Sequence, residues 1–131
     1  MKFKLAIISA LLFATTSIYA NANHVHQESD YIVSITSPDQ ARPVKFSGNY
    51  MLMGDSGSKM VRLDKVTPFE FHAKAETIAV MLMSMELRGD GVTLEIKRYS
   101  NGQEKSTMSG TGSAILAQED DGKGYIITSP K

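Results

Sequence analysis

Two histidines near the start of the sequence, His24 and His26, have the residue types and spacing for metal chemistry. They stand in the run Asn23-His24-Val25-His26. An imidazole beside a free α-amine and an intervening backbone amide can chelate Cu(II) or Ni(II), because these nitrogens complete a square plane. The amine exists there only if the chain is cut just before Asn23. This hypothesis therefore depends on where the precursor is processed.

Methionine thioethers are a second set of candidate ligands, since soft sulfur suits Cu(I). Met51 and Met53 alternate along a run whose opposite face carries Tyr50 and Leu52. If those two larger residues face the core, both thioethers lie on the outer face of a strand. We therefore name Met51 and Met53, together with the two histidines, as candidate copper ligands.

A longer methionine row, Met81, Met83 and Met85, also alternates along one strand face. The row could ligate Cu(I), but it is flanked by Ala79 and Leu87 in the most hydrophobic run after the leader. Methionine fills irregular gaps in apolar interiors. We interpret this row as deformable core packing.

Two patterns resemble catalytic sites, and we expect neither to be catalytic. Gly54 to Gly57, GDSG, copies four letters of the nucleophile motif of chymotrypsin-like proteases, but Ser56 has only His24 and His26 upstream of it as bases. Gly, Asp and Ser also make tight turns. His72 has Glu70 two residues before it on the same strand face, which is typical of a solvated pair. The sequence predicts a protein that is not an enzyme.

The elements that position these residues begin after a leader, Met1 to Ala22. Lys2 and Lys4 precede an apolar run from Leu5 to Ala14, and Ala20-Asn21-Ala22 supplies small residues for cleavage. This is the pattern of a secretory signal peptide. The apolar run is shorter than the roughly 20 residues needed to span a bilayer, and no later segment reaches that length. We expect a periplasmic or secreted product with no transmembrane segment in the mature chain.

Composition excludes several classes of site and partner. The chain has no cysteine, which rules out disulfides, thiolate metal sites and a lipid-modified cysteine after the leader. It has 14 basic and 14 acidic residues, and removing Lys2 and Lys4 leaves a small acidic excess. Nucleic acid binding needs clustered basic residues, so we expect no nucleic acid partner.

After a flexible tail at residues 23–30, one domain is expected over residues 31–131. Apolar and polar residues alternate with a period of two, as in Tyr31, Val33 and Ile35, and turn residues recur at intervals of about 8 to 12. This pattern predicts seven to eight short strands in a small antiparallel β-sandwich of immunoglobulin-like type.

Turn residues and hydrophobicity also predict how particular strands are joined. Residues 89–91 (GDG), 100–102 (SNG) and 121–124 (DGKG) are each expected to close a hairpin. Residues 78–88 are expected to form a central strand. Because Ala, Lys, Glu and Met favour helices, a helix over residues 74–85 is the alternative.

The order of these segments resembles the small exported β-sandwich of MmpS-type transport accessory proteins. The resemblance rests on these residues: Tyr31-Ile32-Val33, Val44 to Tyr50, Thr67-Pro68-Phe69, Gly89-Asp90-Gly91, Val92 to Ile96, and Asn101-Gly102. Members of that family are usually membrane-anchored and assist a lipid exporter. The resemblance implies an exported sandwich with an accessory role.

Together these features predict a non-enzymatic binding or accessory module that acts on a protein or another envelope component without a cofactor. Loops or a free sheet edge would bind the partner, since an edge strand offers unpaired N–H and C=O groups. Chain position suggests the first strand at Ile32 and the last at Ile126 as the edges. The alternative is a periplasmic copper-binding protein that uses His24, His26, Met51 and Met53.

Overall fold

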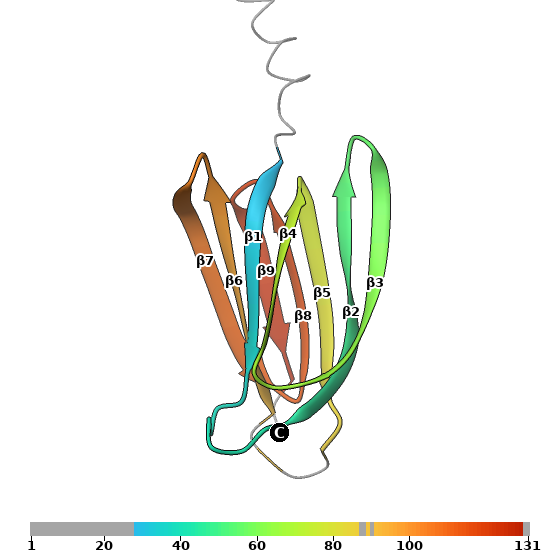
Figure 1. The fold of residues 1–131 in the computed structure, drawn as a ribbon, viewed down its shortest axis with the longest axis vertical. Coiled ribbons are helices and arrows are strands. Elements are labelled where there is room, and N and C mark those ends of the chain that lie inside the picture. The colour runs from blue at the N-terminus through green and yellow to red at the C-terminus, as the bar shows by residue number, and fades with distance from the viewer. Residues whose placement is uncertain (1–27, 87–88, 90, 130–131) are drawn as a thin grey trace, which may run out of the picture.

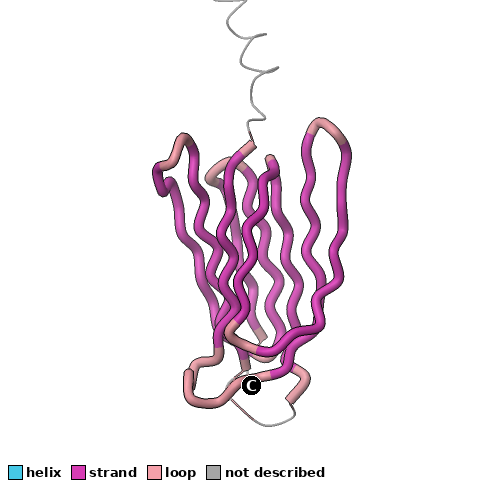
Figure 2. Tube along the Cα trace, viewed as in Figure 1, coloured by secondary structure: helices cyan, strands magenta, loops and turns pink. Residues whose placement is uncertain are grey.

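The described residues form nine antiparallel β-strands. The structure is a computed structural model that describes residues 28–86, 89 and 91–129. Figures 1 and 2 show the strands running side by side, with no helix among the described residues. In chain order they are β1 Ser29–Thr36, β2 Lys45–Gly54, β3 Gly57–Val66, β4 Phe69–Ala75, β5 Thr77–Ser84, β6 Val92–Ser100, β7 Gln103–Gly112, β8 Ala114–Asp120 and β9 Lys123–Thr128.

The strands build two sheets that stack as two layers. The four-stranded sheet has the order β4-β1-β6-β7, and the five-stranded sheet has the order β3-β2-β5-β8-β9. Every pairing within them is antiparallel. The prediction of a small antiparallel sandwich is confirmed, with one or two more strands than expected.

The core lies between the sheets and follows the period-two pattern. Tyr31, Val33 and Ile35 on β1 are completely buried, as their alternation predicts. Burying an aliphatic or aromatic side chain contributes about 1.5–3 kcal/mol, so this shared core supplies most of the stability. The remaining core residues are Val44, Phe46, Leu63, Ala75, Ile78, Val80, Leu82, Val92, Leu94, Ile96, Ile115 and Ala117.

A central strand was predicted over residues 78–88; β5 is central, as predicted, but ends at Ser84, and the helical alternative over residues 74–85 is wrong. β5 pairs with β2 on one side and with β8 on the other. Ile78, Val80 and Leu82 project into the core from it. Ladder hydrogen bonds on both edges, together with this burial, outweigh the helix propensity of the individual residues.

Two of the three predicted hairpins form. Ser100-Asn101-Gly102 joins β6 to β7, and Asp121-Gly122 joins β8 to β9. Asn101 and Gly102 have φ of 54° and 77°, and Asp121 and Gly122 have φ of 48° and 87°. Positive φ at both central residues of the turn matches the right-handed twist of the flanking strands. Asn-Gly and Asp-Gly adopt positive φ readily, so these pairs predicted the two hairpins correctly.

The third predicted hairpin, at Gly89-Asp90-Gly91, is wrong, because β5 and β6 belong to different sheets. This connection passes from the five-stranded sheet to the four-stranded one. β5 already has β2 and β8 as neighbours, and β6 has β1 and β7. Turn residues indicate that the chain changes direction. They do not indicate which sheet the next strand joins, because that depends on the strands with which it pairs.

Gly48 allows β2 and β5 to approach closely in the middle of the five-stranded sheet. A Cβ atom at this position would overlap the Met81 carbonyl oxygen. The ladders from β2 to β3 and to β5 run through this point without a shift in register. A glycine inside a strand often marks a bulge, but here it permits close contact between two strands.

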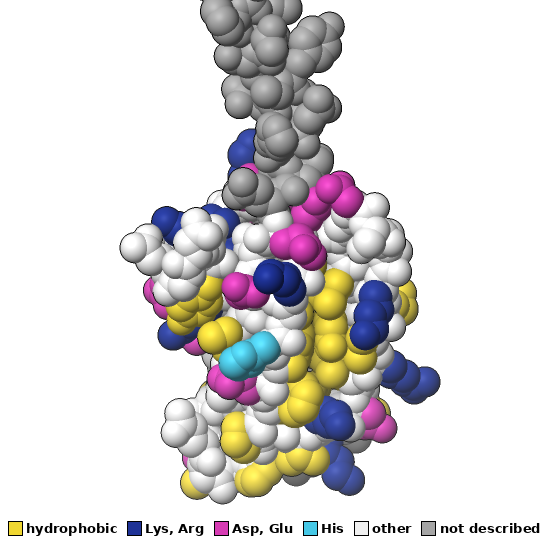
Figure 3. Space-filling view, turned by 45° about the horizontal axis from the view of Figure 1, so that its top comes forward, with side chains coloured by type: hydrophobic (Ala, Val, Ile, Leu, Met, Phe, Trp, Pro, Cys, Tyr) yellow, Lys and Arg dark blue, Asp and Glu magenta, His cyan; other side chains and the backbone are white. Residues whose placement is uncertain are grey.

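The two long sides of the sandwich differ. On one side β7 lies close to β9, since a Cβ at Gly110 would come within 2.9 Å of the Ile126 side chain. On the other side, Tyr50 of β2 stacks on Phe71 of β4 with ring centroids 4.1 Å apart. Figure 3 shows hydrophobic side chains gathered in the gap between β4 and the β2–β3 hairpin. The sandwich is therefore closed at β7/β9 and more open at β3/β4.

Among the described residues, no helix has the length and apolar character needed to cross a membrane.

Candidate functional site

Methionine gathers on the outer face of the five-stranded sheet. Six of the seven methionines that the structure describes lie there, and the seventh, Met108, packs against the core. The strand register places the six opposite or beside one another. Met51 on β2 lies directly across from Met60 on β3 and from Ala79 on β5. The six are Met51, Met53, Met60, Met81, Met83 and Met85.

The methionine row at the end of β5 and just after it is exposed, so its interpretation as core packing is wrong. Met81, Met83 and Met85 expose 52%, 58% and 57% of their surface, whereas Leu82 exposes 1%. Both faces of β5 are apolar, and the core takes the face with Ile78 and Val80. β-Branched side chains pack well on a pleated, buried surface, and this signal could have identified the inward face.

The apolar surface continues from β5 onto β8 and β9. Leu116 on β8 lies across from Met81 on one side and from Ile127 on the other. Leu116, Tyr125 and Ile127 expose 39%, 47% and 58%. We call the set Met51, Met53, Met60, Met81, Met83, Met85, Leu116, Tyr125 and Ile127 the methionine face. Sequence reasoning missed Met60 and the three residues of β8 and β9, because only the register brings them together.

The methionine face is large for an apolar surface exposed to water. Seven of its side chains expose between 39% and 62% of their area. At about 200 Å² for a large side chain, this amounts to on the order of 700 Å², above the roughly 300–600 Å² of the largest patch on a typical monomer. Patches of this size mark interaction surfaces.

The two predicted edge positions have different outcomes. Ile32 lies on β1, which is paired with β4 and β6, so the prediction of an edge at the first strand is wrong. Ile126 lies on β9, which is an edge strand as predicted. Its side chain packs against the core and reaches toward Gly110 on β7. The strand position was predicted correctly, but the side chain does not project outward.

Two of the four candidate copper ligands lie among the described residues and two lie outside them. His24 and His26 lie outside the described residues, as does the whole leader. Met51 and Met53 lie on the outer face of β2, opposite to Tyr50 and Leu52, as the alternation predicts. No group of three or more His, Cys, Asp or Glu side chains in the described part could hold a metal.

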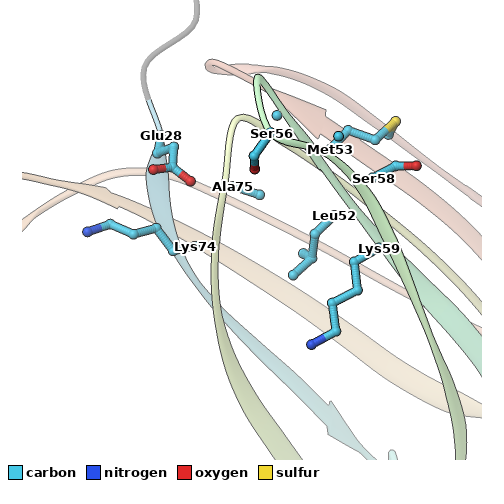
Figure 4. Close-up of a pocket in the computed structure, with 10 residues that line it drawn as sticks. Glu28, Leu52, Met53, Ser56, Ser58, Lys59, Lys74 and Ala75 are labelled. Carbon is cyan, nitrogen blue, oxygen red and sulfur yellow. The ribbon is translucent and has the colours of Figure 1, made fainter.

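Ser56 lies in the turn between β2 and β3, at the mouth of a hollow of about 240 Å³. Figure 4 shows Glu28, Lys59 and Lys74 around an apolar floor formed by Leu52 and Ala75. None of the described residues that line the hollow is a histidine. Residues 55 and 56 form the turn that the sequence predicts between two strands. The two lysines and the carboxylate could orient a small polar molecule.

His72 and Glu70 form the exposed pair that the alternation predicts. His72 Nε2 lies 3.2 Å from Glu70 Oε2, with 66% and 57% of the two side chains exposed. Ser34 Oγ donates a hydrogen bond of 3.2 Å to the other oxygen of Glu70. Solvent screens such an interaction and leaves it worth little. The pair lies on the open outer face of the four-stranded sheet.

One polar cluster lies inside the sandwich. Arg98 of β6 places Nε 3.5 Å from Glu119 Oε1 of β8, and only 14% and 3% of the two side chains are exposed. The Gly122 N–H donates a hydrogen bond of 2.6 Å to the same carboxylate. Asp121 lies 3.7 Å from Arg98 Nη1. The cluster is satisfied internally and ties one sheet to the other, which indicates a structural role.

Comparison of the chain with protein-family models, with curated proteins and with solved structures finds no match.

Proposed function

We propose that this chain is a non-enzymatic binding module of the cell envelope that docks a protein partner through the methionine face. The observation that carries the proposal is the extent of that face, on which Met60, Met81, Met83, Met85 and Ile127 each expose more than half of their surface. Methionine suits such a role because its flexible, polarisable side chain adapts to a partner's shape.

The shape and area of the face favour a protein with a flat apolar surface as the partner. The face is one side of a β-sheet, and sheets pack against other flat layers about 10 Å apart. Its area of on the order of 700 Å² is close to the roughly 800 Å² per partner of a stable protein–protein interface.

Charge supports a protein partner over an anionic lipid surface. The β3 edge of the face carries one residue of each sign, Arg62 and Asp64, beside Met60. Amphipathic surfaces that bind anionic membranes are rich in Lys and Arg instead. The leader at residues 1–22 supports export, which would place the partner in the periplasm or outside the cell.

Site-specific photocrosslinking in the native host tests this proposal. A benzophenone amino acid at Met83 should give a discrete crosslinked protein band. The same probe at Thr107, which is exposed on the four-stranded sheet, should give none. Adding Met81→Glu and Ile127→Glu to the Met83 probe should abolish the band, because two carboxylates would have to be desolvated in the interface.

The remaining outcomes decide between kinds of partner. Sedimentation of the purified chain measures whether it forms a dimer, and so whether the partner is a second copy or a different protein. No band from Met83, or equal bands from Met83 and Thr107, would contradict the docking face. Flotation of the wild-type chain with phosphatidylglycerol vesicles, lost in the double Glu variant, would replace the protein partner by a lipid surface.

A further inference from the structure

β3 is a free edge strand at the open side of the sandwich. It pairs with β2 on one side only, and Figure 1 shows it as the outermost strand of its sheet, at the right-hand side. Its ten residues include no proline, and its ladder with β2 runs without a shift in register. Natural proteins often protect an edge with a short strand, a proline or a bulge. β3 has none of these three features, so its edge can accept another strand.

Alternate residues of β3 present their backbone groups to this free edge. Just beyond β3, the Thr67 N–H donates a hydrogen bond of 2.9 Å to the Val44 carbonyl oxygen. Hydrogen-bonded pairs recur at every second residue of an antiparallel ladder, so the odd-numbered residues of β3 bond to β2. The N–H and C=O groups of the even-numbered residues therefore point away from β2 and can pair with a second strand.

The outward side chains of β3 are complementary to a second copy of the same strand. Met60, Arg62, Asp64 and Val66 alternate along this side, and all four are exposed. Their order is apolar, positive, negative, apolar. Neither Arg62 nor Asp64 forms an ion pair with another described residue. If the strand is placed antiparallel to itself, each charge meets the opposite charge and each apolar residue meets the other.

We propose that two copies of this chain form a symmetric dimer by antiparallel pairing of β3 with β3, centred on Leu63. This register places Arg62 opposite Asp64 of the second copy, and Met60 opposite Val66 of the second copy. A two-fold axis repeats both pairs, because residue i meets residue j and j meets i. All four residues are even-numbered, so each pair can exchange two backbone hydrogen bonds.

The other registers that use the same backbone groups are less favourable. Centring the pairing on Arg62 or on Asp64 would set two like charges directly opposite each other, which is destabilising. Centring it on Val61 or Lys65 would set both charges opposite uncharged residues. Only the register centred on Leu63 gives each charge an opposite partner.

Two lysines on the inward side of β3 do not oppose this pairing. In the register centred on Leu63, Lys59 lies opposite Thr67 of the second copy and Lys65 lies opposite Val61 of the second copy, so no two lysines meet. Lys65 Nζ also lies 5.5 Å from the centre of the Phe69 ring in its own chain.

The dimer would join the two five-stranded sheets into one continuous sheet. A two-fold axis perpendicular to the sheet keeps the outer faces on the same side, so the two methionine faces would lie next to each other. The proposal uses the edge of β3 rather than the methionine face, and it does not depend on the docking of another protein.

Sedimentation of the purified chain over a series of concentrations tests the dimer. Wild type should change from one copy to two as the concentration rises. Arg62→Asp and Asp64→Arg should each weaken the dimer by about tenfold or more, because each turns two opposite-charge pairs into like-charge pairs. An equimolar mixture of R62D and D64R should restore the dimer, and so should the double variant R62D/D64R, since opposite charges face each other again.

Two controls separate the β3 edge from other surfaces. Lys74→Asp makes the same change of net charge on β4, the edge strand of the other sheet, and should leave the dimer intact. The M81E/I127E variant should also remain a dimer, which would show that β3 and not the methionine face holds it. R62D should keep the Met83 crosslink, so failure of this dimer and failure of docking are distinguishable.

Cysteine crosslinking checks the register independently, because the chain has no cysteine of its own. Met60→Cys and Val66→Cys, when mixed, should form a disulfide-linked dimer, since directly opposed residues lie about 5.5 Å apart. Either variant alone should form none, because its two sulfurs would lie about 20 Å apart along the strands.

Several results would overturn the proposal. A wild-type chain that stays monomeric at every concentration would do so, as would a mixture of R62D and D64R that stays monomeric although thermal melting shows both variants folded. Equal weakening by K74D or loss of the dimer in M81E/I127E would place the contact elsewhere. Disulfide formation by M60C alone or V66C alone, equal to that of the mixture, would contradict the register.

Discussion

At the scale of single residues, Tyr31 shows how burial changes side-chain chemistry. Its side chain is completely buried, and its hydroxyl donates a hydrogen bond of 3.2 Å to the Glu76 carbonyl oxygen. Burial and the negative charge of Glu119 raise the pKa of Tyr31 to about 12, against the opposing effect of Arg98. The neutral phenol is therefore the form that the fold stabilises.

This pKa predicts a loss of stability at alkaline pH. The unfolded chain releases the Tyr31 proton near pH 10.0, whereas the folded chain holds it until about 12. Between these values the unfolded state binds fewer protons, so the free energy of unfolding falls as pH rises, by on the order of 2 kcal/mol. Urea unfolding at a series of pH values should show this fall in wild type and a smaller one in Tyr31→Phe.

Tyr125→Phe is the control for this measurement, because Tyr125 is 47% exposed. It should keep the alkaline loss of stability. An equal slope in wild type and Tyr31→Phe would contradict the assignment to Tyr31.

At the scale of elements, β5 has two apolar faces of which only one is buried. Leu82 exposes 1% of its surface and Met83 exposes 58%. Successive side chains of a strand point to opposite sides, so a shift of one residue in register would exchange the two faces. The pairing of β5 with β2 and β8 determines which face is inward.

This orientation predicts opposite outcomes for two neighbouring truncations. Leu82→Ala should lower the free energy of unfolding by about 3 kcal/mol, because it leaves a cavity in the core. Met83→Ala should change it by less than about 0.5 kcal/mol, because solvent fills the space. Chemical unfolding of both variants measures the difference. A large loss in Met83→Ala would mean that the methionine face is covered in the folded protein.

At the scale of the whole molecule, an ion pair spans the two sheets. Arg98 belongs to the four-stranded sheet and Glu119 to the five-stranded sheet, with 3.5 Å between Nε and Oε1. Removing one partner of a buried pair leaves an uncompensated charge and costs about 3–5 kcal/mol. The pair therefore couples the two layers at one end of the core.

A double-mutant cycle tests this coupling. Arg98→Met alone should destabilise the protein by about 3 kcal/mol. Arg98→Met combined with Glu119→Gln should recover much of this loss, because the amide is neutral and can still accept the Gly122 hydrogen bond. Urea unfolding of wild type and the three variants gives the coupling energy.

The exposed pair Lys97–Glu104 is the reference for the cycle. Lys97 Nζ lies 3.8 Å from Glu104 Oε1, and 36% and 48% of the two side chains are exposed. Lys97→Met should therefore lower the free energy of unfolding by less than about 1 kcal/mol. Strict additivity in the Arg98–Glu119 cycle would show that the two groups do not interact.

Much of the fold and part of the candidate site could be predicted from the sequence. Alternation placed Tyr31 inward and Met51 outward, and Asn101-Gly102 marked a true hairpin. The hairpin at Gly89-Asp90-Gly91 and the edge at Ile32 were wrong. Both of these predictions concerned which strands are neighbours, and neighbours depend on contacts between distant parts of the chain.

By itself the sequence determined the β-class, the turns and the period of each strand, because these follow from local backbone sterics and side-chain alternation. Only the tertiary structure decided which apolar face of β5 is buried and that Met51 and Met60 lie opposite each other on the outer face of the five-stranded sheet. The hydrophobic effect is non-directional, so two apolar faces of one strand compete equally until pairing with other strands selects one.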